Sequence, residues 1–250
     1  MADTAPDPIP AATLIVMREG DGGAPEILMV ERSSAMRFAG GALVFPGGRV
    51  DPGDVACAAA IGGDRDEAAA RIAAIRETIE EAGLAIGVHG EVDVEGARHA
   101  LYAGTPIAEV LGHEALELDQ LVPFARWLPH AGVSHRVFDT RFYLAAWPKG
   151  AGEPVADGNE SVRLLWATAR HVLNEADQGR ARIIYPTRRN LERIAQFATY
   201  ADAVAHARAH PVTTTITPWI ETRDGMDHLC IPEGLGYPVT AEPLTGVLRA

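Results

Sequence analysis

The chain has 250 residues, of which 47% are hydrophobic and 22% charged, and its formal net charge is −12. This composition is typical of a folded globular domain and excludes a disordered or fibrous chain. An acidic surface repels the nucleic-acid backbone, so we expect no nucleic-acid partner.

The cysteines and the start of the chain indicate the compartment. Cys57 and Cys230 lie far apart without a paired spacing, which predicts reduced thiols rather than a disulfide or zinc site. No apolar run reaches the roughly 20 residues of a membrane span. The acidic, proline-containing start lacks the basic and apolar segments of a signal peptide. We therefore expect a cytoplasmic protein with no membrane partner.

The front of the chain has the pattern of a β-sheet. Residues 1–10 are rich in Pro and Asp and predict a flexible lead-in. Apolar runs at 11–17 and 27–30 flank a Gly-rich turn and predict paired strands. A further run, 42–45, stops at a Pro-Gly-Gly turn.

Helical and strand patterns then alternate. Residues 67–82 have apolar side chains at helical spacing and end before Gly83, a residue typical of helix C-caps. The stretch 94–118 is of mixed, mainly helical character, and strands are predicted at 121–128 and 141–147. We therefore predict an α+β fold, an αβα sandwich with a mixed central sheet.

The last part of the chain predicts a helical region and a hairpin. The helical region spans 191–210, with its entry at Pro186-Thr187 and its end at Pro211. Asp224-Gly225 separates two apolar runs and predicts a β-hairpin. We expect one domain over 11–210, with 211–250 as an extension packed on it.

Three carboxylates share one face of the predicted helix at 67–82. Glu77, Glu80 and Glu81 are spaced i, i+3 and i+4, so they lie within about one turn. Such a face can be a solvated surface, but the apolar opposite side and the nearby Pro-Gly-Gly turn favour a site. Mg²⁺ and Mn²⁺ prefer oxygen ligands, and a cation relieves the repulsion between these carboxylates. The sequence therefore predicts a site for Mg²⁺ or Mn²⁺.

The whole pattern resembles the Nudix hydrolase signature, GX5EX7REUXEEXGU, in which U is aliphatic. Residues 48–84 match it, and every charged and glycine position of the helix half is present as Arg76, Glu77, Glu80, Glu81 and Gly83, with Leu84 as the closing aliphatic residue. Three positions depart: Asp54 replaces the first Glu, Thr78 replaces an aliphatic residue, and 21 residues separate Asp54 from Arg76 where the signature has seven. We place the insertion at 55–70 and predict a loop followed by an extended helix start.

A second motif, LMVERSSAMRFAGGALVFPGG at 28–48, is similar to one that accompanies the Nudix box in coenzyme A diphosphatases. It departs from that motif at Met29 and Val30. Planar guanidinium groups suit phosphate oxygens, so Arg32 and Arg37 are candidates for binding substrate phosphates, although both can also be ordinary surface residues. Phe45 and Gly47 complete the predicted substrate-binding set.

The resemblance also implies roles for the acidic residues. Glu77, Glu80 and Glu81 would hold the metal with the Gly48 carbonyl and Asp54, and Glu77 and Glu81 would be catalytic. Arg76 would pair with an acidic side chain and position the catalytic loop. Glu160, in an acidic turn at 157–160, is the predicted additional ligand or base, with a solvated turn as the alternative.

The activity implied by the resemblance is metal-dependent hydrolysis of a small nucleotide diphosphate. The larger acyl-CoA diphosphatase branch is the most similar, through residues 138–148 and Trp166. CoA or acyl-CoA would then give (acyl-)phosphopantetheine and adenosine 3′,5′-bisphosphate. NADH, ADP-ribose or another nucleoside diphosphate is the alternative substrate, and a non-catalytic nucleotide-sensing module is the alternative function. Dimers are frequent in the family, so a homodimer fits.

Overall fold

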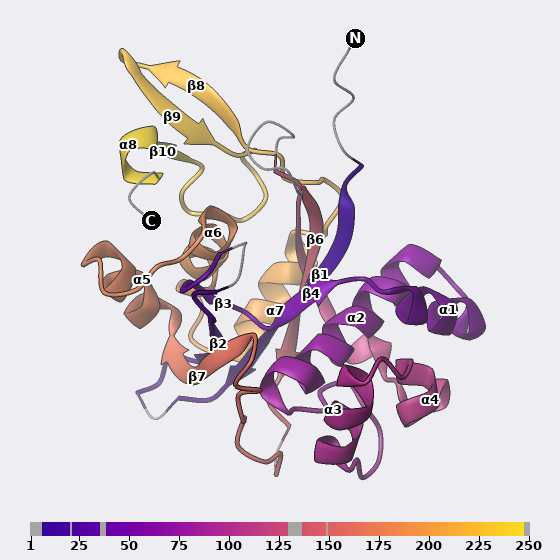
Figure 1. Cartoon of the computed structure of the whole chain (residues 1–250). Helices are drawn as coiled ribbons and strands as arrows, with labels where there is room; N and C mark the ends of the chain where they lie inside the picture. The colour runs from indigo at the N-terminus through magenta and orange to yellow at the C-terminus, as the bar shows by residue number, and fades with distance from the viewer. Residues whose placement is uncertain (1–6, 21, 36–38, 130–136, 149, 248–250) are drawn as a thin grey trace.

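The computed structural model describes residues 7–20, 22–35, 39–129, 137–148 and 150–247. A mixed sheet of seven strands forms its centre, in the order β3-β2-β1-β6-β5, with β4 paired to β1 and β7 paired to β2 (Figure 1). The strands are β1 (Ile9–Arg18), β2 (Glu26–Arg32), β3 (Leu43–Val44), β4 (Gly47–Arg49), β5 (Val122–Trp127), β6 (Phe138–Ala146) and β7 (Ser161–Thr168).

Strand β1 has apolar side chains on both faces because it lies at the middle of the sheet. Leu14 and Val16 belong to one core cluster, and Ile15 and Met17 belong to the other. Its partner β6 runs parallel to it, and the remaining ladders of the sheet are antiparallel. A strand covered on both sides must lack the polar alternation of a half-exposed strand.

Helices cover both faces of the sheet (Figure 1). The first cluster lies beneath α1 (Pro52–Ile61), α2 (Arg65–Ala82), α3 (Val94–Tyr102) and α4 (Ile107–Leu111), followed by the short 3-10 turns η1 (His113–Ala115) and η2 (Leu118–Gln120). The second lies beneath α5 (Ala169–Asp177), α6 (Tyr185–Ile194) and α7 (Tyr200–Ala209). The predicted αβα sandwich with a mixed sheet is confirmed.

The insertion contains a helix that the sequence analysis did not predict. The prediction for 55–70 was a loop followed by a helix start, whereas α1 spans Pro52–Ile61 and α2 begins at Arg65. Residues 55–61 are almost uniformly apolar and small, so they lack the alternation of polar and apolar side chains that predicts an amphipathic helix. Cys57 and Ala58 pack into the core from α1, and only that packing reveals which side is inward.

Two other predicted element boundaries differ from the structure because of local hydrogen bonds. β1 begins at Ile9, inside the predicted lead-in, because the Ile9 N–H bonds to the Val137 carbonyl at 2.8 Å; residues 1–6 lie outside the described part. The helical region predicted at 191–210 is two helices. Thr199 caps the second by accepting the Asp202 N–H at 3.1 Å, so the chain turns between α6 and α7.

The tail forms the predicted hairpin and adds a third strand. β8 (Trp219–Arg223) and β9 (Met226–Cys230) are joined at Asp224 and Gly225, both with positive φ, and β10 (Ala241–Pro243) pairs with β9 before α8 (Leu244–Val247). The tail contacts the preceding helices through Tyr237, whose buried hydroxyl donates to Asn190 at 2.8 Å. No helix in the described segments is long and apolar enough to cross a bilayer.

Candidate functional site

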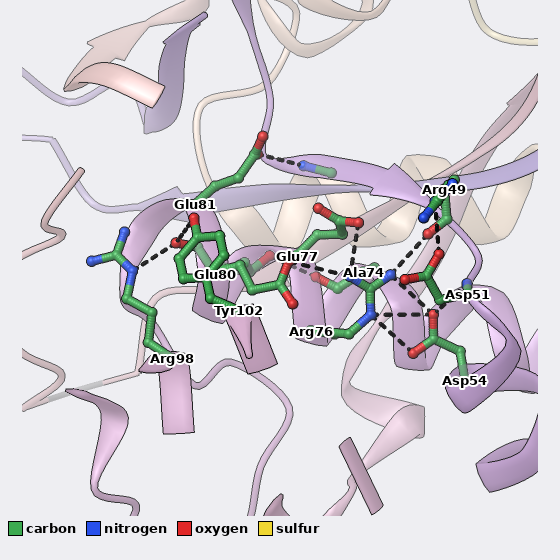
Figure 2. Close-up of polar contacts among 12 residues, drawn as sticks. Arg49, Asp51, Asp54, Ala74, Arg76, Glu77, Glu80, Glu81, Arg98 and Tyr102 are labelled. Atoms are coloured by element: carbon green, nitrogen blue, oxygen red, sulfur yellow. Dashed lines mark hydrogen bonds and ion pairs between the residues drawn. The ribbon is translucent and has the colours of Figure 1, made fainter. Parts of the chain in front are cut away.

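Helix α2 carries the three glutamates at its C-terminal end (Figure 2). Asp64 starts the helix by accepting the N–H groups of Asp66 and Glu67, both at 3.1 Å. Gly83 ends it in the left-handed conformation, with φ of 65°. The apolar side of α2 is buried in the first core cluster, and this fixes the rotation of the helix and with it the side that carries the glutamates.

The Pro-Gly-Gly turn brings backbone against these glutamates. The Gly47 N–H donates to the Glu81 carboxylate at 3.0 Å. A Cβ on Gly48 would lie 2.3 Å from Oε1 of Glu77, so only glycine allows this approach. Arg32, at the end of β2, places Nη1 3.7 Å from the other oxygen of Glu81. Three segments far apart in the sequence therefore meet at one point.

Burial leaves the negative charge of these glutamates poorly compensated. It raises the pKa of Glu81 to about 8, and the charge of Glu77 adds to the effect. It raises the pKa of Glu77 to about 7 even though Arg76 acts in the opposite direction, and it also raises the pKa of Glu80. An all-oxygen donor set with excess negative charge fits a hard divalent cation.

Arg76 connects the elements that surround the site through its hydrogen bonds. Its Nε donates to Asp54 at 3.1 Å and its Nη2 donates to the carbonyl of Arg49 at 2.8 Å. Its Nη1 donates to Glu77 at 2.9 Å and to Glu80 at 3.3 Å (Figure 2). One guanidinium therefore joins α1, β4 and α2, and it pairs with acidic side chains rather than facing solvent.

Asp54 lies behind Arg76 instead of beside the other carboxylates. It is 1% exposed, both of its oxygens accept from Arg76, and Oδ2 also accepts the Asp51 N–H at 2.8 Å. Its acceptor capacity is thus used by Arg76 and by the start of α1. This geometry differs from the metal ligand expected at this position and supports a positioning role.

The glutamates share one end of α2 without forming a closed cage. Among the residues that the structure describes, no group of three or more Asp, Glu, His or Cys is arranged to hold a metal ion. Glu81 turns toward Gly47, whereas Glu77 and Glu80 turn toward Arg76 (Figure 2). Like charges repel, and each carboxylate takes the nearest protein donor.

Glu160 lies beside this group on an exposed turn. Asp157 closes the turn by accepting the N–H groups of Asn159, Glu160 and Ser161 at 3.2, 2.9 and 2.7 Å. The Glu160 carbonyl accepts the Ser33 N–H at 2.8 Å, next to Arg32, and the charge of Glu160 contributes to the raised pKa of Glu81. The fold therefore brings Glu160 close to Glu81.

One member of the predicted substrate-binding set, Phe45, does not line the site. Phe45 is 2% exposed and packs edge-to-face on Phe142, with ring centroids 6.5 Å apart, in the core on the other face of the sheet. It therefore supports the turn from behind instead of presenting a surface to a ligand. Arg37 lies outside the described residues.

Two residues of α3 that the sequence analysis did not single out hold the end of α2. Arg98 Nε and Tyr102 Oη donate to the carbonyl of Glu80 at 2.7 and 2.9 Å (Figure 2). Carbonyls in the last turn of a helix lack partners within it, so these donors fix the helix end that carries Glu80 and Glu81. Their i, i+4 spacing in a helical stretch was the only sequence signal.

Comparison with known families decides the identity of this arrangement. The profile of the NUDIX domain matches residues 8–186, more than half of the chain. The chain belongs to the Nudix family. The predicted Nudix hydrolase fold is thereby confirmed, and this Nudix hydrolase acts on small substrates linked through a nucleoside diphosphate. Nudix hydrolases generally use divalent metal ions.

The chain is also similar to solved structures, and the first of them, at 30% identity, agrees with this assignment. A NUDIX hydrolase from Alicyclobacillus acidocaldarius is 30% identical, with a TM-score of 0.72 over 80% of this chain and 96% of its own. A MutT NUDIX hydrolase from Burkholderia pseudomallei is 18% identical, with a TM-score of 0.43 over 75% of this chain and 98% of its own. A C. elegans Ap4A hydrolase is 17% identical, with a TM-score of 0.36 over 80% and 96%. No protein with curated annotation matches the Nudix chain significantly.

Proposed function

We propose that this Nudix hydrolase cleaves the diphosphate bond of coenzyme A or acyl-CoA, with Mg²⁺ or Mn²⁺ held by Glu77, Glu80 and Glu81. The observation that carries the proposal is the 3.7 Å approach of Arg32 to Glu81. Arg32 belongs to the motif similar to that of coenzyme A diphosphatases, and Glu81 belongs to the metal-binding helix. Substrate recognition and metal binding would thus occur side by side.

The arginines would bind the phosphates of the substrate. Coenzyme A carries a 3′-phosphate in addition to its diphosphate, and guanidinium groups bind such oxygens in pairs. Arg32 is 15% exposed at its side chain and lies where a phosphate held near Glu81 would be within reach. Arg37 is assigned to the same task from the sequence motif alone.

The acidic residues, with the metal ion bound, would carry out the hydrolysis itself. When bound, the divalent ion supplies neutralisation of phosphate charge and acidification of a water molecule. Arg76 would hold Glu77 and Glu80 in place through its hydrogen bonds, and the Gly47 N–H would hold Glu81. Glu160 accepts the proton of the attacking water. The water oxygen bonds to phosphorus, the bridging P–O bond breaks, and the diphosphate becomes two monoesters.

A substrate panel tests the proposal. CoA, an acyl-CoA, NADH and ADP-ribose are incubated with Mg²⁺ or Mn²⁺, and products are separated by chromatography for the wild type, Glu81→Gln and Glu160→Gln. Glu91→Gln serves as the matched control because Glu91 is exposed and lies outside the motif, beyond its end at Leu84. We expect CoA esters to give adenosine 3′,5′-bisphosphate, with a loss of about 100-fold or more in Glu81→Gln and no change in the control.

The possible outcomes separate the alternatives. Hydrolysis of NADH or ADP-ribose with CoA esters untouched would refute the substrate assignment while leaving the Nudix chemistry intact. Undiminished cleavage by Glu81→Gln would refute the metal-binding helix. Tight binding of a nucleotide without cleavage of any compound would favour the sensing module.

A further inference from the structure

A second concave site lies at the opposite end of α2. The groove is bounded by the N-terminal half of α2, strands β5 and β6 and the end of α7, and its volume is about 630 Å³. Sites for small molecules span roughly 300–1,000 Å³. Glu67 of the groove and Glu77 are ten residues apart on α2, or about 15 Å at the rise of an α-helix. The groove is therefore separate from the glutamate site.

Guanidinium groups dominate the groove although the whole chain is acidic. The residues that line it include four arginines, Arg71, Arg126, Arg141 and Arg208, and two carboxylates, Asp64 and Glu67. The whole chain has a formal charge of −12, so a lining with more arginines than carboxylates is a local departure from its overall charge. A cleft of one sign raises the local concentration of ligands of the opposite sign.

Carboxylates pair with three of these four arginines, including Asp119, which lies 3.8 Å from Arg71 Nη1, and Arg208 is the exception. Glu67 is shared, since it accepts Arg71 Nε at 3.0 Å and lies 3.4 Å from Arg141 Nε. Arg126 has its own partner, Asp139, at 2.8 Å. Arg208 is exposed and makes no ion pair or side-chain hydrogen bond within the described segments. Arg208 therefore brings to the groove a positive charge that pairs with no carboxylate of the described segments, and Glu67 is divided between Arg71 and Arg141.

A buried hydroxyl adds a directional donor. Tyr143 lines the groove but is 1% exposed, and its hydroxyl interacts with Glu67 without forming a hydrogen bond of good geometry. Burial and the nearby charge of Glu67 hold the pKa of Tyr143 above its usual range, so the hydroxyl keeps its proton. A buried donor without a partner costs about 1–3 kcal/mol, and a ligand oxygen would remove that cost.

We propose that this groove is a second small-molecule site, which binds a phosphate monoester between its arginines and Tyr143. A phosphate monoester offers three strong acceptor oxygens and nearly two negative charges, which match several donors arriving from different elements. Val122, Pro123 and Phe142 form an apolar wall beside the arginines and would contact the organic part of the ligand. This site does not depend on which diphosphate the enzyme cleaves.

Inorganic phosphate is the first probe. It is titrated into the whole protein with EDTA present, at constant ionic strength maintained with chloride, and binding is followed by calorimetry. The test variants are Arg208→Gln and Tyr143→Phe, and the matched control is Arg170→Gln, an exposed arginine on α5 outside the groove. We expect saturable binding that weakens about fivefold or more in both test variants and is unchanged in the control.

A fourth variant separates the two sites. Glu81→Gln should leave phosphate affinity unchanged, because the groove lies at the other end of α2. Tyr143→Phe removes only a hydroxyl without a well-formed partner, so urea unfolding should show no loss of stability. Phosphate binding that is absent, that chloride replaces equally well, or that falls in Glu81→Gln but not in Arg208→Gln would overturn the proposal.

Discussion

Gly48→Ala should disable the enzyme without unfolding it. Gly48 lies in β4 opposite Ala12 and has no positive φ, so the backbone accepts an alanine. The added methyl group would lie 2.3, 2.5 and 2.7 Å from the Oε1, Cδ and Oε2 atoms of Glu77. These atoms are the end of a flexible side chain, which can move aside. The cost should therefore fall on the position of Glu77.

The size of the effect follows from these distances. Restoring ordinary van der Waals contact requires the Glu77 carboxylate to move by about 1 Å, and a misplacement of this size can lower a rate by about 100-fold. The conformational freedom of glycine in the unfolded chain also favours the alanine variant slightly. We expect kcat/KM to fall about 100-fold and the free energy of unfolding to change by less than about 1 kcal/mol, which is under about 4 °C in Tm.

Alanine substitutions at two further glycines serve as comparisons for Gly48→Ala. In Gly47→Ala the new Cβ would lie 2.4 Å from the carbonyl oxygen of Ala12 and 2.7 Å from Cα of Thr13, which are backbone atoms of β1 and cannot move alone. That variant should lose about 3 kcal/mol of stability or more. Gly152→Ala has no atom within 4 Å of the new Cβ and should match the wild type.

The assay combines metal-dependent hydrolysis of the substrate found in the panel with urea unfolding of the metal-free protein. Full activity in Gly48→Ala would show that the contact between Gly48 and Glu77 does not matter for catalysis. A loss of activity that only follows a loss of folded protein would show that the methyl group disturbs β4 rather than Glu77. Either result refutes the reasoning.

Three other changes have defined outcomes. Arg76→Gln leaves Asp54 buried without its partner and should lower the free energy of unfolding by about 3–5 kcal/mol, with Asp54→Asn in the same chain recovering part of it; additive losses in urea unfolding would argue against the pair. The Thr78 hydroxyl donates to the Ala74 carbonyl of its own helix at 2.7 Å. Thr78→Val should therefore change the free energy of unfolding by less than about 1 kcal/mol in the same assay, and a larger loss would mean that the hydroxyl is required. Burial and the charge of Arg193 lower the pKa of His206 to about 4, below its usual value near 6.5, so the unfolded chain binds more protons and stability should fall as pH drops from about 6.5 to 4. His206→Phe should be less sensitive to acid over that window by urea midpoint, and an unchanged slope would contradict the assignment.

The sequence predicted those features that depend on local pattern. The 3.6-residue spacing of Ile72, Ile75 and Ile79 located α2, and Gly83 located its end, because capping and helix periodicity are properties of neighbouring residues. The same periodicity placed the glutamates on one face. It could not detect α1, whose apolar and alanine-rich residues lack a polar face to mark its orientation.

The motif letters 76–81 and 45–48 indicated the family and its chemistry, but they did not assign partners. Asp54 stood in the position of a predicted ligand, and its burial behind Arg76 was decided by the packing of α1 against α2. Phe45 was predicted to contact substrate, and the turn of the chain at Pro46 instead directs it into the opposite core. A linear motif shows which residues are present. Whether each side chain points into the site depends on how elements distant in the sequence pack together.

The groove that contains Tyr143 depended entirely on tertiary structure. Arg71, Arg126, Arg141 and Arg208 come from three separate regions of the chain, and none belongs to a recognisable motif. Their charges add only because the α2 start, the β5–β6 edge and the α7 end meet in space. The sequence by itself thus determined the chemistry that is concentrated along one helix. The tertiary structure decided the sites that are assembled from distant residues, because electrostatic and packing energies depend on distance in space rather than along the chain.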